Sequence, residues 1–380
     1  MKIGFVSAHP FTYPGGVQTH TLALKEEFED RGHSIKLIFP REEFPQKKDK
    51  DTILLGGAFY VSSNASKANI SFQVTPLVIK RMLKKENFDI LHFQNLGLFL
   101  PIQVLDASNS LKEKGKKMLN ILTLHAFWDA SKIFRDWAFL IDVLNKNILP
   151  KFDGVIAVSS PVLSQIKYNG PIEIIPNGIN LEIFHPKGKT IKKFSDGKVN
   201  ILFVGRIEKR KGLIYLLEAF NILRKKHKNI RLIIVGDGER KDKMERLVKK
   251  KRIPDVFFEG NVSNVNLPKY YRTADICCFP SVYGEAFGIV LLEAMATAKP
   301  VVAFANKGYR EVLKADGAEF LSRPKDFNEL SKKIEVLVKN KNLRKKMGEW
   351  GRREAKKYSW TKVADRTLNF YDKVLKSKTR

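Results

Sequence analysis

The chain has 380 residues, 43% of them hydrophobic and 11% aromatic, so it is long enough for two folded domains and too apolar for a disordered protein. Its apolar runs fall short of the roughly 18 residues that a membrane span needs. Lysine and arginine number 69 against 40 acidic residues, a formal charge of +29, which suits an anionic partner.

The basic residues are spread along the chain, without a recognised nucleic-acid-binding module or aromatic residues between the basic runs. Nucleic acid is therefore not an expected partner, although a basic nucleic-acid-binding protein remains an alternative. The strand-like start at residues 1–7 does not resemble a signal peptide. Cys277 and Cys278 are neighbours on one predicted strand and point to opposite faces, so neither a disulfide nor a metal pair is expected. These features favour a cytoplasmic protein; they predict no particular oligomeric state.

Strand-like and helix-like segments alternate along the whole chain, which is typical of parallel α/β domains. In the first half, helices are predicted over 17–31 and 137–149, and strands over 3–7, 34–39, 90–93, 119–124, 154–158 and 173–175. In the second half, helices are predicted over 214–226 and 241–250, and strands over 199–204, 232–235, 256–259, 276–279 and 301–303.

We therefore expect two doubly wound, Rossmann-like domains that face each other across a cleft. The N-terminal domain spans 1–185, a Gly- and Lys-rich linker follows at 186–197, and the second domain spans 198–357. Residues 358–380 have apolar side chains at helical spacing and are predicted to form a C-terminal helix that packs back toward the N-terminal domain.

Three motifs follow predicted strands, at the edge of a parallel sheet where ligands bind. Gly15 and Gly16 precede a helix and would let backbone amides approach a diphosphate, or would simply form a turn. The segment lacks G-x-G-x-x-G, which counts against a nicotinamide enzyme. His125 follows strand 119–124 and is a candidate catalyst or a structural donor. Arg206 and Lys211 follow strand 199–204 and suit two oxygens of a leaving diphosphate, or form an exposed basic loop.

Residues 284–295 form the most informative motif, with Glu285 in the loop after strand 276–279 and Glu293 two turns into the next helix. Free N–H groups at Gly288 and Ile289 would favour a phosphate. Carboxylates beside a phosphate site need hydroxyl donors, and a nucleotide sugar offers hydroxyls as well as a diphosphate. Alternatively, Glu285 only complements the helix dipole and Glu293 is only solvated.

In chain order these motifs resemble the family 4 retaining glycosyltransferases of the GT-B fold, most closely the phosphatidylinositol mannosyltransferases. The matching segments are 14–20, 123–125, 175–178, 205–212 and the E-x7-E pattern of 285–293. The resemblance implies that the N-terminal domain binds the acceptor and the second domain the nucleotide sugar. It implies donor-binding roles for Gly16, Arg206, Lys211, Val262, Ala286, Phe287, Gly288, Ile289 and Glu293.

The same resemblance implies that His125 and Glu285 are catalytic and that Gln18 faces the acceptor. It also implies that no metal or other cofactor is required, so Arg206, Lys211 and the helix start would stabilise the departing nucleotide. The one D-x-D sequence, at 49–51, lies in a Lys-rich loop and is not interpreted as a metal site.

A basic amphipathic helix is predicted over 76–85, where Lys80, Arg81, Lys84 and Lys85 share one face. The lipid-using relatives carry such a helix at this place, so these residues are predicted to face an anionic membrane. The alternative is an ordinary helix that covers the sheet. Residues 93–96 and 126–129 depart from the pattern of those relatives, both on the acceptor side.

The sequence thus predicts a retaining hexosyltransferase, with mannose from GDP-mannose as the first choice of donor and a lipid-linked or phosphorylated acceptor. The protein would then be peripheral on the inner face of the cell membrane, with an anionic membrane lipid as partner. A transferase that uses a UDP-sugar with a soluble sugar or polysaccharide acceptor is the alternative. A sugar-nucleotide epimerase of the same fold is a further one.

Overall fold

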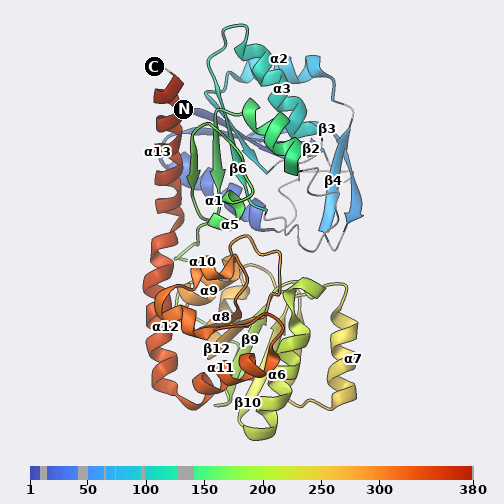
Figure 1. Ribbon diagram of the computed structural model, residues 1–380, viewed down its shortest axis with the longest axis vertical. Coiled ribbons are helices and arrows are strands. Elements are labelled where there is room, and N and C mark those ends of the chain that lie inside the picture. Colours follow the sequence, from blue (N-terminus) through green and yellow to red (C-terminus); the bar gives the residue numbers. More distant parts are fainter. Residues whose placement is uncertain are drawn as a thin grey trace. The chain divides into compact units, whose positions relative to one another are not determined.

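The computed structural model describes residues 1–8, 15–41, 50–63, 66–72, 74–95, 99–126 and 141–378. The chain forms two compact units (Figure 1). Unit 1 comprises Met1–Asn177 and Trp360–Arg380, and unit 2 comprises Gly178–Ser359. The C-terminal helix therefore belongs to unit 1, although the whole of unit 2 separates it from the rest of that unit in sequence.

The described part of unit 1 contains an eight-stranded sheet in the order β4-β3-β2-β1-β5-β6-β7-β8, parallel except for β4 against β3. Every residue of β5 and β6 is buried, as expected for the central strands of a sheet covered on both faces. The strands are β1 (Lys2–Ser7), β2 (Ser34–Arg41), β3 (Thr52–Ser63), β4 (Ser66–Phe72), β5 (Ile90–Gln94), β6 (Leu119–Leu124), β7 (Gly154–Ala157) and β8 (Ile172–Ile174).

In its described part, unit 1 contains the helices α1 (Gly16–Asp30), α2 (Pro76–Glu86), α3 (Leu100–Lys112), α5 (Ser160–Leu163) and α13 (Trp360–Lys378). Helices α1, α2, α3 and α5 connect the strands, and α13 follows unit 2 in the sequence. In Figure 1, α2 and α3 lie side by side. On α13, Val363, Phe370, Tyr371 and Val374 are buried at the three- and four-residue spacing of one helix face, and they share a core with Phe28 of α1.

The sheet of unit 2 is parallel throughout its described strands, in the order β11-β10-β9-β12-β13-β14. Its strands are β9 (Val199–Val204), β10 (Ile230–Val235), β11 (Val256–Gly260), β12 (Ile276–Phe279), β13 (Val301–Phe304) and β14 (Leu321–Ser322). The strand order reverses between β9 and β12, so the crevice outside their carboxyl ends is the topological switch point where such sheets bind ligands.

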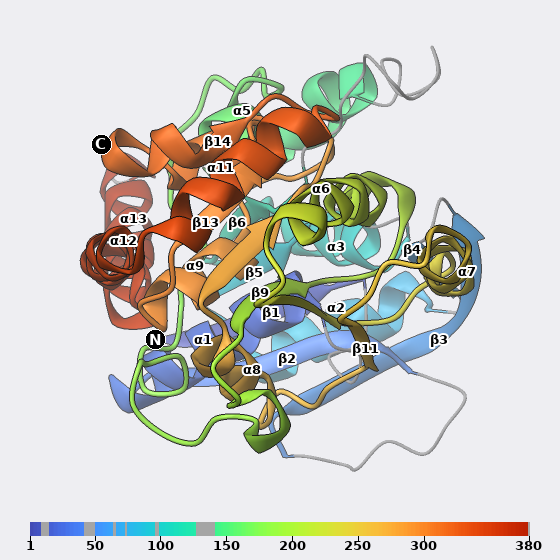
Figure 2. The same ribbon diagram turned by 90° about the horizontal axis from the view of Figure 1, so that it is seen from below.

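Helices cover this second sheet: α6 packs against α11, and α9 packs against α12 (Figure 2). The helices are α6 (Leu213–Lys226), α7 (Lys241–Lys251), α8 (Leu267–Thr273), α9 (Ile289–Ala296), α10 (Tyr309–Val312), α11 (Phe327–Lys339) and α12 (Lys341–Ala355).

The predicted α/β class and the predicted strands are confirmed, each within about two residues. The sequence did not reveal β3 and β4, which form an antiparallel hairpin at the edge of the unit 1 sheet. Residues 186–197, which we expected to be a linker, lie in unit 2, where Phe194 belongs to the core. The predicted helix 137–149 falls partly outside the described residues; from Leu144 to Ile148 the chain forms a π-helical turn.

Packing of α13 on the sheet depends on Gly154, which faces this helix from β7. A Cβ atom there would lie 2.8 Å from a methyl group of Val374 and 3.0 Å from the ring of Phe370. We expect Gly154→Val to lower the free energy of unfolding of unit 1 by about 2 kcal/mol, because overpacking outweighs the strand preference of valine. Faster hydrogen–deuterium exchange in β7 and α13 of this variant would show the loss of stability. The exposed change Lys373→Ala on α13 should leave exchange unaltered, and equal exchange in both variants would contradict this packing.

Candidate functional site

The loops that follow β9 and β12 meet at the switch point of unit 2. The N–H of Val282 donates to the backbone oxygen of Arg210 over 2.8 Å, which joins the two loops. Their approach requires Gly212, whose φ is +69° and whose Cβ would lie 2.0 Å from the oxygen of Pro280. The predicted residues Lys211 and Glu285, 74 positions apart, are thereby brought into contact.

Glu285 is 9% exposed and forms ion pairs with two neighbouring cations. Its Oε1 accepts from Nζ of Lys211 over 2.7 Å and from a guanidinium nitrogen of Arg210 over 3.0 Å. Burial opposes ionisation of Glu285, but the charges of Lys211 and Arg210 outweigh it and hold the pKa of this carboxyl below its usual value. Glu285 is therefore a charged acceptor at neutral pH.

A second layer of polar side chains lies behind Glu285. Ser281 hydrogen-bonds the carboxylate, and the hydroxyl of Tyr309 donates to Oγ of Ser281 over 3.1 Å. Tyr309 also restricts position 288, because a Cβ on Gly288 would lie 2.7 Å from its ring. Gly288 has φ +114° and precedes α9, so the chain can turn into this helix only where a side chain is missing.

Glu293 lies on α9 and has a different environment from Glu285. The hydroxyl of Tyr271, which is fully buried, donates to Oε2 of Glu293 over 2.6 Å. Burial raises the pKa of Glu293 to about 7, against smaller opposite effects of Tyr271 and Lys211. The influence of Lys211 on both carboxyl groups places the three side chains in one cluster.

The other predicted donor-binding residues of unit 2 lie in the loops after β9, β11 and β12 and at the start of α9. Arg206 is 54% exposed at its side chain and lies 3.6 Å from the buried carboxylate of Glu208. Phe287 is buried and packs on Tyr358, with ring centroids 5.6 Å apart. Val262, Ala286 and Ile289 are half-buried.

In unit 1, His125 follows β6 beside the end of β5. Its backbone N–H donates to Oδ1 of Asn95 over 2.7 Å, and its ring Nε2 lies 2.8 Å from Oε1 of Gln94. Because an amide oxygen only accepts, Nε2 carries the proton in this contact, and His125 also hydrogen-bonds the side chain of Asn177. Burial, then the neighbouring His20 and His92, keep the pKa of His125 well below its usual value, so the ring is neutral.

His125 is part of a buried polar network. The ring of His20 contacts it edge-on at 4.6 Å between centroids, and Nδ1 of His20 donates to Oδ1 of Asn177 over 2.9 Å. Burial lowers the pKa of His20 to about 4. His92 is bonded on both ring nitrogens, to Thr123 and to Tyr371 of α13, each over 2.6 Å.

Gly16 is the first residue of α1 and is exposed, and Gln18, two residues later, is half-buried. On α2, Arg81, Lys84 and Lys85 are exposed, whereas Lys80 is half-buried and donates to Oγ of Ser110 over 3.0 Å. Leu77 and Val78 are also exposed, by 59% and 48%.

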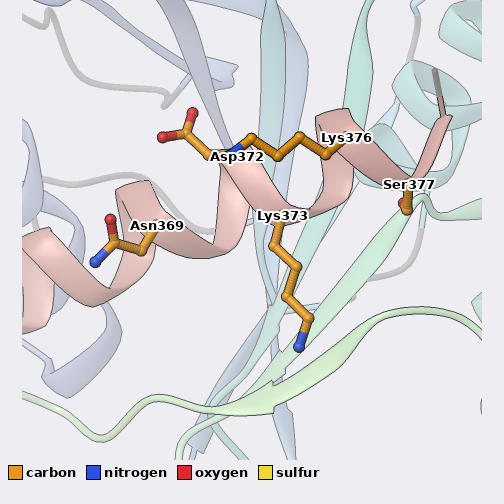
Figure 3. A pocket seen from close by; sticks show the side chains of 5 residues that line it. All are labelled: Asn369, Asp372, Lys373, Lys376 and Ser377. Atoms are coloured by element: carbon orange, nitrogen blue, oxygen red, sulfur yellow. The ribbon is translucent and has the colours of Figure 1, made fainter. Parts of the chain in front are cut away.

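A hollow on unit 1 runs along α13 (Figure 3). It is lined by Asn369, Asp372, Lys373, Lys376 and Ser377. Its residues come from one exposed helix face, and none of the predicted catalytic or donor-binding side chains is among them.

Four residues that the sequence did not indicate contact the predicted site residues or their neighbours. Arg210 stood beside Lys211 in a basic run, and only its contact with Glu285 distinguishes it. Asn177 lies in the matching segment 175–178 without a predicted role, and its side chain accepts a hydrogen bond from His20. Tyr271 and Tyr309 gave no sequence signal, because a buried tyrosine at helical spacing is usual in a core.

The raised pKa of Glu293 predicts a pH-dependent stability. The native state holds a proton that the unfolded chain releases near pH 4.5, so the contribution of this group is lost as the pH rises through about 7. We expect the free energy of unfolding of wild type, relative to Glu293→Gln, to fall by about 2 kcal/mol between pH 5 and pH 8, because solvent at the half-buried carboxyl screens part of the effect. Denaturant titrations at both pH values measure it, and parallel pH dependences in the two proteins would contradict it.

Two family models match the chain. The model described as Glycosyltransferase Family 4 matches residues 14–183, and the model described as Glycosyl transferases group 1 matches residues 184–354. A phosphatidyl-myo-inositol mannosyltransferase of Mycobacterium leprae is 29% identical over 99% of this chain and 98% of its own length.

Solved structures share the fold. A glycosyltransferase from Rickettsia africae has a TM-score of 0.77 at 22% identity, over 99% of both chains. Anabaena HepE in complex with UDP and glucose has a TM-score of 0.72 at 16% identity, over 98% of this chain and 99% of that one. Together the two family models span residues 14–354, and the chain belongs to the family 4 glycosyltransferases of the GT-B fold.

Proposed function

We propose that this glycosyltransferase moves a hexose with retention from a nucleoside diphosphate sugar, GDP-mannose first, to a lipid-linked or phosphorylated acceptor at the membrane surface. The observation that carries the donor half is the contact of Lys211 with Glu285 at the switch point. It puts a carboxylate for sugar hydroxyls next to a cation for a diphosphate. The similarity to the mannosyltransferase of M. leprae over nearly the whole chain supports the choice of sugar and acceptor.

In the proposed reaction, the bond between the anomeric carbon and the diphosphate oxygen breaks, and the acceptor oxygen bonds to the same face of the sugar. The acceptor proton passes to the departing diphosphate. Arg206 and Lys211 stabilise the charge that develops on the leaving group, which provides electrostatic stabilisation without a metal ion. Glu285 accepts from sugar hydroxyls, and the catalytic role of His125 stays a prediction.

The acceptor and the location depend on α2. Arg81, Lys84 and Lys85 lie exposed on the same helix as exposed Leu77 and Val78, and this combination suits an interface of anionic headgroups and acyl chains. We therefore propose a peripheral attachment to the inner face of the cell membrane. Among the helices in the described part of the chain, none has the length and apolar character of a membrane span.

A second candidate is a transferase that uses a UDP-sugar with a soluble acceptor. It is favoured by the structural neighbour Anabaena HepE, which was solved with UDP and glucose. A panel of GDP-mannose, UDP-glucose and UDP-N-acetylglucosamine, assayed by thermal shift and by slow hydrolysis, separates the two. If no nucleotide sugar is hydrolysed or raises the melting temperature, the transferase proposal fails.

Variants of the unit 2 cluster test the donor site. We expect Glu285→Ala to abolish transfer, and Lys211→Ala and Arg206→Ala to lower kcat about 10²–10³-fold, because they lose charge stabilisation that grows in the transition state. Glu293→Ala should raise the donor KM more than it lowers kcat. Steady-state kinetics measure these effects, with the exposed neighbour change Lys209→Ala as the control. Wild-type rates in Glu285→Ala or Lys211→Ala would remove those residues from the site.

Vesicle sedimentation tests the membrane proposal. We expect wild type to bind anionic vesicles and not neutral ones. The triple change of Arg81, Lys84 and Lys85 to Gln should lower binding about 100-fold, since each cation is worth about 1 kcal/mol. Lys80 is not replaced, because it donates a hydrogen bond to Ser110 and its loss could disturb the packing of α2.

A triple change on unit 2 provides the matched control. Lys243, Lys249 and Lys250 are exposed on α7, and their replacement by Gln removes the same charge from a different helix. Equal losses in both triple variants would mean that attachment is non-specific. Wild type that ignores anionic vesicles would favour the soluble acceptor.

A further inference from the structure

Arg210 bridges two buried carboxylates in unit 2. Its Nε lies 2.5 Å from Oε1 of Glu208, and a terminal nitrogen lies 3.0 Å from Oε1 of Glu285. The same nitrogen lies 3.4 Å from the backbone oxygen of Gly284. Glu208 and Glu285 are only 6% and 9% exposed. A planar guanidinium held at both ends has little freedom to leave.

In the proposed reaction, the ammonium group of Lys211 interacts with two anions, the Glu285 carboxylate and the leaving diphosphate. It bonds the same Oε1 of Glu285 as Arg210 does, over 2.7 Å, and in the proposed reaction it must also meet the leaving diphosphate. A lysine is a point charge on a flexible stem, so it can turn from one anion to the other. A buried carboxylate that loses its only counterion is strongly destabilised or takes up a proton.

We infer that Arg210 is a positioning residue: it keeps Glu285 ionised and oriented, so that Lys211 is free to turn to the leaving diphosphate. This inference rests on the proposed function. The contact of Val282 with the backbone oxygen of Arg210 fixes the base of the side chain, and Glu208 fixes its middle. The pKa of Arg210 is raised, because the charges of Glu285 and Glu208 outweigh burial, which opposes its ionisation.

The first test needs no substrate. Protein labelled with 13C at the glutamate carboxyl carbon is titrated by NMR, and Glu285→Gln identifies the signal. We expect Glu285 to remain ionised at neutral pH in Lys211→Gln, because Arg210 is still paired with it. In the double variant Lys211→Gln/Arg210→Gln the signal at the same pH should be that of the protonated acid. Protonated Glu285 in Lys211→Gln alone, or ionised Glu285 in the double variant, would overturn the inference.

The second test is kinetic and uses the donor that the panel identifies. In Arg210→Gln the acid limb of kcat/KM should move to higher pH, because Glu285 is protonated more easily. We expect the ratio of kcat/KM at pH 5 to that at pH 7 to fall about tenfold, the equivalent of one pKa unit. Arg210→Lys should restore most of the ratio, and Lys209→Gln, in the same turn, should match wild type. If kcat/KM of Arg210→Gln falls by the same factor at every pH, Arg210 has a merely structural role and the inference is overturned.

The two failures are distinguishable. If no nucleotide sugar is hydrolysed or bound by wild type, the proposed function fails, while the titration still shows whether Arg210 can keep Glu285 ionised. If wild type is active but the acid limb of Arg210→Gln is unmoved, the inference fails and the transferase stands. Circular dichroism of Arg210→Gln shows whether this variant is folded. Arg210→Lys, which keeps the charge, is measured in the same way for comparison.

Discussion

The constraint on which unit 2 depends is the burial of a charged carboxylate. Removing one partner of a buried ion pair costs about 3–5 kcal/mol, so Glu285 can be 9% exposed only while Lys211 and Arg210 stay beside it. Both cations come from the loop after β9, and Glu285 comes from the loop after β12. The ion pairs therefore hold together the two loops that border the switch point.

The loops at this edge of the sheet also approach one another closely through their backbones. Gly212 ends the short turn of Lys209–Lys211 and lies against Pro280, so that the turn can place its cations next to Glu285. Gly236, after β10, meets the backbone oxygen of Gly205 in the same way, with a hypothetical Cβ 2.1 Å away. Three loops at one sheet edge thus pack backbone against backbone. The site consists of fixed backbone with charged side chains on it, as electrostatic stabilisation of a leaving group requires.

The fold was predictable from the sequence because parallel strands buried on both faces are short, mainly apolar runs, as in 119–124 and 199–204. The hairpin β3–β4 was not predicted, because its sequence is interrupted by Gly56, Gly57 and several serines. An antiparallel pair at a sheet edge can have one solvated face, so it needs no long apolar run. The E-x7-E spacing indicated Glu285 and Glu293 as site residues, which stays a prediction. It did not predict that Arg210 contacts Glu285 while Lys209 is exposed, since this depends on the direction of each side chain in one short turn.

The two carboxyl groups of the E-x7-E motif show how environment separates like residues. Glu285 has two cations and a low pKa, whereas Glu293 has a buried tyrosine and a pKa of about 7. Carboxyl groups whose environments push their pKa values apart usually have different tasks. At neutral pH the ionised Glu285 can only accept hydrogen bonds, whereas Glu293, which exchanges its proton near neutrality, can donate as well as accept. In the proposed reaction, this difference suits Glu285 to the sugar hydroxyls and Glu293 to a hydroxyl elsewhere on the donor.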